Sequence, residues 1–210
     1  MAPSTPDVID LLAGISKGSA IDRIRSERPD TRDNAQKSYL ALFEPAEPFD
    51  VTQSERLALA SFVSGLHKAR EVAEFYSSGF ADLPGGASIA GAIRAEAEKG
   101  VTYGPYGRFP AGPLSAEDRL GPEFSVSEFN AVTLGKKLSA ALEHAHLLVF
   151  RPREATPQAL QKLLDAGWST TGVVTLSQIV SFLAFQIRVV SGLNALATAA
   201  KPQVASNAAE

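Results

Sequence analysis

The sequence predicts an all-α protein, and three observations lead to that prediction. Apolar residues recur at the three- and four-residue spacing of a helix face in several segments. Helix-starting signals, a hydroxyl or carboxylate residue followed three positions later by an acid, stand in front of these segments. No segment shows the sustained apolar–polar alternation that a half-buried strand needs. With 210 residues, 45% of them hydrophobic, the chain is long enough for one domain with a real core.

Residues 1–29 are predicted to form a leader with weak patterning. Its charges alternate in sign, which is typical of a solvated surface. The first helix is predicted to begin at Asp30, with Asp33 three residues on as its capping partner. Tyr39 and Phe43 then share one helical face.

The next helix begins with a strong signal. Thr52 and Glu55 have the spacing of a capping box. The following stretch, Leu57–Val63, is apolar almost all round, which predicts a buried helix. A helix of small residues is expected over 87–99, closed by Gly100. These elements make up an N-terminal helical half, residues 30–100.

Residues 101–124 carry eight glycines and prolines and are predicted to form a long ordered loop rather than a helix. A second helical half, residues 125–200, follows this loop. Ser125 and Glu128 again have the capping-box spacing. Thr156 followed by proline predicts another helix start, because proline fits the first helical position.

Three leucines of that helix, Leu160, Leu163 and Leu164, are expected to face inward. The last helix, from about 173 to 199, is very apolar. Its polar interruptions, among them Arg188, argue against a membrane span and favour a core helix or a helix buried between subunits. Arg188 itself needs a partner or an aqueous cavity. Residues 201–210 are predicted to be a flexible tail.

Composition excludes several classes of function. The chain has no cysteine, so disulfides, thiol nucleophiles and cysteine-bound metals are impossible. Only three histidines are present, and we expect no metal site. The net charge is −3 and the basic residues are dispersed, so we expect no nucleic-acid partner. The N-terminus lacks a secretory signal pattern, which predicts a cytoplasmic protein.

Short motifs give a resemblance to a known family. The stretches Gly167–Val174 and Phe182–Arg188 resemble the C-terminal half of the carboxymuconolactone decarboxylase superfamily, in its alkyl hydroperoxidase D-like, peroxidase-related branch. Ser54–Ala60 resembles the start of the active-site helix of that superfamily. The similarity covers most of residues 50–196. It implies an alkyl hydroperoxidase D-like helical fold with two related helical halves joined by the Gly/Pro-rich loop.

The resemblance also locates the site where peroxidase members carry their thiols. Glu55 matches the family glutamate. The two cysteines of the family's Cys-x-x-Cys pair fall at His67 and Arg70, and the family histidine falls at Glu74. Thiol peroxidase activity is therefore excluded, since it needs both thiols. The decarboxylase branch is also cysteine-free, so catalysis without thiols is compatible with the family.

Glu55 and His67 are the candidate catalytic residues. A histidine with a pKa near 6.5 suits proton transfer at neutral pH, and a nearby carboxylate would tune it. Each residue also has a structural interpretation. Glu55 has the position of a capping-box carboxylate, and His67 lies between two apolar segments where structural histidines are common.

Arg70, Tyr103 and Arg108 are the candidate substrate-binding residues. Arg70 would bind a carboxylate in a bidentate manner, but it also has the spacing for a surface ion pair with Glu74. Tyr103 and Arg108 would cover the pocket as part of a lid, or simply anchor the loop.

The function expected from these residues is cofactor-free acid/base chemistry on a small carboxylated or carbonyl compound. The alternative is a non-catalytic member of the fold that binds a ligand or a partner. The resemblance further implies a homo-oligomer, a dimer, trimer or hexamer, that buries the long apolar helices.

Overall fold

The computed structural model describes residues 6–80 and 83–199. Within those ranges it contains nine α-helices, two 3₁₀ helices and no strand, which confirms the all-α prediction. The helices are α1 (Val8–Leu12), α2 (Ala20–Ser26), α3 (Pro29–Phe43), α4 (Gln53–Leu66), α5 (Arg70–Ser78), α6 (Gly86–Gly100), η1 (Pro113–Glu117), α7 (Glu128–Phe150), η2 (Pro152–Glu154), α8 (Pro157–Asp165) and α9 (Thr170–Ala199). The tail predicted at 201–210 lies outside the described residues.

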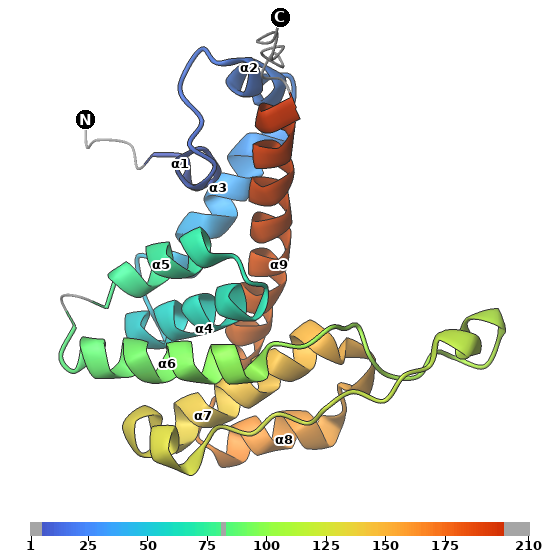
Figure 1. The fold of residues 1–210 in the computed structure, drawn as a ribbon. Coiled ribbons are helices and arrows are strands. Elements are labelled where there is room, and N and C mark those ends of the chain that lie inside the picture. The colour runs from blue at the N-terminus through green and yellow to red at the C-terminus, as the bar shows by residue number, and fades with distance from the viewer. Residues whose placement is uncertain (1–5, 81–82, 200–210) are drawn as a thin grey trace, which may run out of the picture.

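Helix α4 is the centre of the structure. It packs against α5, α6, α7 and α9, and every residue from Leu57 to Val63 is buried, as its all-round apolar pattern predicts. Helix α9 is the long column of Figure 1 and runs from the N-terminal helices down to α7 and α8. The buried residues of all these helices form one contiguous cluster from Val8 to Val190.

Helix α4 begins as its sequence predicts. The Thr52 hydroxyl accepts from the Glu55 backbone N–H, and the Glu55 carboxylate accepts from the Thr52 backbone N–H, at 3.2 and 2.8 Å. The buried Arg56 follows. It donates to the carbonyl oxygens of Leu42, Pro48 and Val51 and so ties the α3–α4 connection to the helix.

Two other predicted helix starts are wrong. Helix α3 begins at Pro29 rather than Asp30 and has no side-chain cap, because its N-cap residue is Arg28; Asp33 forms an ion pair with Lys37 at 2.6 Å. Helix α7 is capped by Ser127 rather than Ser125. The reason is tertiary: the buried carboxylate of Glu96 accepts from the backbone N–H and the hydroxyl of Ser127 and holds it at the cap.

The leader is more ordered than its charges predict. Residues from Asp7 onward form α1 and α2, with Val8 and Ile9 buried in the core. Arg25, whose side chain is only 8% exposed, pairs with Asp7 and Asp10. Part of the leader's charge is therefore a partly buried ion-pair network, while Arg23, Glu27 and Arg28 are exposed as predicted.

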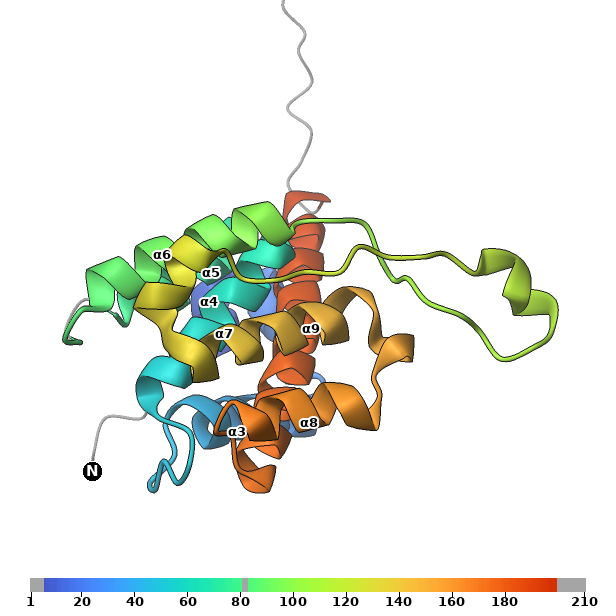
Figure 2. The ribbon, with the colours of Figure 1, turned by 90° about the horizontal axis from the view of Figure 1, so that it is seen from below.

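The Gly/Pro-rich loop is an extended arm. Figures 1 and 2 show it leaving the body as two antiparallel segments that run out to a short helical tip, the 3₁₀ helix η1. At 101–124 the prediction of an ordered loop without α-helix holds in the structure.

Helix α9 is the one helix in 6–80 and 83–199 that is long and apolar enough to cross a membrane by length and composition. Half of its most apolar window is buried inside the protein. A core helix of a soluble protein passes the same test, so this is weak evidence for a membrane span.

Candidate functional site

The end of α4 has an unusual backbone. After Leu66 the chain closes a Schellman motif, in which Lys68 N–H donates to the Gly65 carbonyl and Ala69 N–H to the Ser64 carbonyl, at 2.9 and 3.0 Å. The residue at the left-handed position of this motif is usually glycine, but here it is Lys68, with φ of +57°. The helix therefore ends at Leu66, and the apolar pattern resumes in a separate helix, α5.

His67 and Lys68 lie at this helix end and form part of a cavity of about 660 Å³. Its other walls come from the base of the arm at 102–105, from the end of α7 and from α9. This volume falls within the range of small-molecule sites. The wall residues that are not charged are apolar side chains, hydroxyls and backbone: Leu66, Thr102, Tyr103, Gly104, Pro105, Leu148, Val149, Phe150, Pro152, Ser177, Val180, Ser181 and Ala184.

The charges in the cavity wall are all positive. Lys68 and Arg188 contribute the two cations, and none of the described residues in the wall is acidic. The Lys68 ammonium lies 3.4 Å from the Tyr103 hydroxyl and 5.1 Å from the centre of its ring. The Arg188 guanidinium donates to the Ala184 carbonyl at 2.7 Å and is otherwise exposed. The cavity is therefore suited to an anion.

The surroundings of His67 favour its neutral form. Burial lowers its pKa, and the positive charge of Arg188 lowers it further. Its Nε2 atom is closed to water and has no hydrogen-bond partner. The Ser64 hydroxyl, one helical turn earlier, is buried and unpartnered as well. Unsatisfied buried polar atoms are rare in native proteins, and functional sites are among the places where they occur.

The structure does not bring Glu55 and His67 together. They occupy opposite ends of α4, roughly 18 Å apart at a rise of about 1.5 Å per residue. The second carboxylate oxygen of Glu55 forms an ion pair with Lys137 at 2.7 Å, and the Glu55 side chain is 13% exposed. Within one chain, Glu55 is a capping residue and cannot tune the pKa of His67.

The three predicted binding residues are also separated. Tyr103 lines the cavity. Arg70 is exposed and pairs with Glu74 at 3.6 Å, which matches the surface-pair interpretation. It borders a neighbouring hollow of about 380 Å³ that also contacts His67. Arg108 is exposed on the arm and does not line the cavity.

The other two histidines are buried. His146 donates from Nε2 to the Gly100 carbonyl at 2.9 Å and stacks on Phe124. Burial lowers the pKa of His144 and of His146. Among the described residues no group of three or more histidines and carboxylates has the geometry to hold a metal ion.

Lys68 and Arg188 line the cavity but are not among the site residues that the sequence predicts. Arg188 had a signal, since a guanidinium in an apolar helix needs water or a partner, and the cavity supplies access to water. No sequence pattern indicates Lys68, because its place in the site depends on a positive φ angle that the sequence does not predict.

The fold and the cavity define an all-helical protein with a cation-lined site at the end of its central helix. Comparison of the chain with protein-family models, with curated proteins and with solved structures finds no match.

Proposed function

We propose that this chain is a cysteine-free member of the carboxymuconolactone decarboxylase superfamily, of the alkyl hydroperoxidase D-like type. In this proposal it binds a small carboxylated compound in the cavity at the end of α4 and acts on it without a cofactor. The observation that carries the proposal is the placing of Lys68 and Arg188 beside His67, in a wall without acidic groups.

Arg188 is the principal anion binder in this scheme, in place of Arg70. A guanidinium binds a carboxylate with two parallel hydrogen bonds. Lys68 adds a second positive charge to the cavity wall, next to the Tyr103 hydroxyl.

His67 is the proposed base. Its lowered pKa keeps the imidazole neutral, which is the form that accepts a proton. A carboxylate held by Arg188 would place the adjacent carbon next to the ring. The two cations would stabilise the negative charge that develops when a proton leaves that carbon.

One observation favours the non-catalytic alternative. The Nε2 atom of His67 is closed to water, so only the other ring nitrogen is left to act on a ligand. A ligand-binding protein with the same cavity would need Arg188 and Lys68 but no proton transfer.

The proposal is tested by binding of benzoate, with benzamide as the uncharged probe of equal shape, followed by calorimetry or ligand-observed NMR. We expect benzoate to bind and benzamide not to bind. Arg188→Gln should weaken benzoate binding about 10- to 100-fold, the value of one or two charge-assisted hydrogen bonds.

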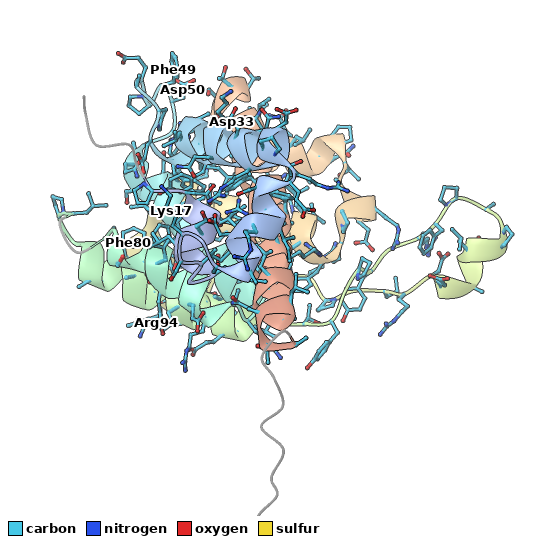
Figure 3. The ribbon with its side chains drawn as sticks, turned by 90° about the horizontal axis from the view of Figure 1, so that it is seen from above. Lys17, Asp33, Phe49, Asp50, Phe80 and Arg94 are labelled. Carbon is cyan, nitrogen blue, oxygen red and sulfur yellow. The ribbon has the colours of Figure 1, made fainter. Side chains whose placement is uncertain are left out.

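Two arginine variants serve as matched controls. Arg94→Gln removes an exposed arginine that points outward from α6 (Figure 3) and should leave binding unchanged. Arg70→Gln separates the two candidate anion binders. If Arg70→Gln weakens benzoate binding and Arg188→Gln does not, the site is misassigned.

Catalysis is tested separately with His67→Gln. Proton exchange at the carbon between the carbonyl and the carboxylate of a bound 3-oxoacid is followed by NMR in deuterated water. Loss of that exchange with benzoate binding retained supports acid/base chemistry. Exchange that is absent in the unaltered protein supports the binding-only alternative.

A further inference from the structure

The arm, defined here as residues 107–120, is held by its own hydrogen bonds and, near its base, by the body, where the Arg153 guanidinium lies 3.5 Å from the centre of the Phe109 ring. Gly107 and Arg119 exchange backbone hydrogen bonds of 2.8 and 3.3 Å, and the Asp118 carboxylate accepts from the Phe109 N–H at 2.7 Å. At its base, the Tyr106 N–H donates to the Phe150 carbonyl at 2.6 Å. The far part of the arm, with η1, projects free of the rest of the chain (Figures 1 and 2).

The arm exposes apolar side chains both at its tip, where Leu114 lies in η1, and near its base, where Leu120 follows the Gly107–Arg119 pairing. Leu114 is 53% exposed and Leu120 is 84% exposed. The arm carries two positive and two negative residues, Arg108, Arg119, Glu117 and Asp118, so its net charge is zero. A preformed, neutral and apolar projection of this kind gains free energy when it is covered.

The body carries a groove of matching character. It lies between α3, α8 and α9, has a volume of about 790 Å³, and has no charged residue in its wall. Leu160 on α8 and Val174 and Phe185 on α9 leave 42%, 56% and 41% of their surface open there. This groove explains why Leu160 does not face inward as its spacing predicts. Leu164, 37% exposed on the same helix, also departs from that prediction.

We propose that the arm of a second copy of this chain occupies the groove, and that the exchange is reciprocal, so that two copies form a dimer. The arm leaves the body on the side that also carries α8, one wall of the groove (Figures 1 and 2). Two copies facing each other on this side would each insert an arm. Each copy would contribute about 25 residues, arm and groove together, which matches the roughly 20–30 residues a side of a stable interface.

The exchange has a consequence for the cavity. Ser177 and Ser181 on α9 line both the groove and the His67 cavity. An arm in the groove would therefore cover α9 beside the cavity mouth and restrict access of water to it. The dimer itself does not depend on the function proposed for that cavity.

The absence of cysteine makes the exchange easy to map. In Leu114→Cys/Val174→Cys the only two thiols stand on the arm and in the groove. Mild oxidation should link two copies into a covalent dimer, resolved by non-reducing electrophoresis. Leu114→Cys alone and Val174→Cys alone should stay unlinked. A disulfide closed within one chain, or a dimer formed by Val174→Cys alone through α9–α9 contact, would overturn the proposal.

The oligomeric state gives a second test that needs no oxidation. Light scattering after size exclusion at micromolar concentration should show a dimer, and Leu120→Asp should convert it to a monomer of unchanged helicity. Phe129→Asp is the matched control, since Phe129 is equally exposed, at 85%, but lies on α7 outside the arm and the groove. A monomeric unaltered protein, or a dimer that survives Leu120→Asp, would refute the arm exchange.

Discussion

Replacing Lys68 by glycine should relieve strain in the backbone and at the same time weaken anion binding. Lys68 has φ of +57° at the left-handed position that ends α4. A side chain in that region costs about 1–2 kcal/mol, and glycine avoids this cost. Glycine also gains about 0.5–1 kcal/mol of chain entropy in the unfolded state, which offsets part of the gain. The backbone effect alone is therefore a stabilisation of about 0.5–1 kcal/mol.

The comparison with Lys68→Ala isolates that backbone effect. Both substitutions remove the ammonium and its contact with Tyr103, an exposed cation–π contact at 5.1 Å that contributes about 0.5–1 kcal/mol. Only glycine relieves the strain. Lys68→Gly should thus have a Tm about 2–4 °C above that of Lys68→Ala, the usual shift for about 1 kcal/mol in a chain of this size.

Binding should respond in the same way to both substitutions. Each removes one of the two cations of the cavity wall, so benzoate affinity should fall about 10-fold in both. Lys68→Arg should retain most of it. Equal Tm values for the glycine and alanine variants would refute the strain argument, and undiminished benzoate affinity in both would refute the role of Lys68 in the site.

Three further predictions concern stability. Glu55→Ala removes the capping carboxylate and its ion pair with Lys137. The free energy of unfolding, measured with urea, should fall by about 1–2 kcal/mol. A loss of benzoate binding as large as in Arg188→Gln would contradict the assignment of Glu55 as a cap. Burial lowers the pKa of all three histidines in the folded protein. The unfolded chain therefore binds more protons than the folded protein near and below about pH 6.5, and the free energy of unfolding should decrease as the pH falls from about 7.5 to 5.5. Histidine NMR titrations of the folded protein that give ordinary pKa values would disprove this cause. Arg25→Ala removes a largely buried partner of Asp7 and Asp10, both of which still pair with Arg32, and should cost about 1.5–3 kcal/mol in the same urea assay, the value of a hydrogen bond to a charged group. Arg23→Ala, on the exposed face of α2, should cost little.

The sequence predicts those features of the fold that depend on neighbours along the chain. The capping box at Thr52 and the all-round burial of Leu57–Val63 follow from local pattern, and both are observed. The cap of α7 does not follow from local pattern, because a carboxylate 31 residues earlier, that of Glu96, selects Ser127. The same limit explains the leader, whose ion pairs join Arg25 to aspartates 15 and 18 residues away.

The sequence predicts only part of the candidate site, for a related reason. Spacing along α4 placed Glu55 and His67 in one helix, but a helix also fixes the distance between its ends. Two groups twelve residues apart on a helix cannot meet at one small molecule. What joins His67 to its neighbours is the approach of α9 and the base of the arm, which supply Arg188 and Tyr103.

The distribution of unsatisfied polar groups supports the end of α4 as the site. Elsewhere in the core, buried charges have full sets of partners: Arg56 donates to three carbonyls, and Glu96 accepts from Ser127 and Asn130. Four buried side-chain atoms in the described part of the chain have no partner, and three of them, on Ser64, His67 and Gln186, lie within three residues of the cavity wall. The sequence pairs its buried charges in the rest of the core. Near the end of α4 it leaves these polar atoms unpaired and holds Lys68 in a strained backbone conformation, so the destabilising features gather in one region. Such departures cost stability and occur preferentially at functional sites, so their concentration near the end of α4 supports this region as the site.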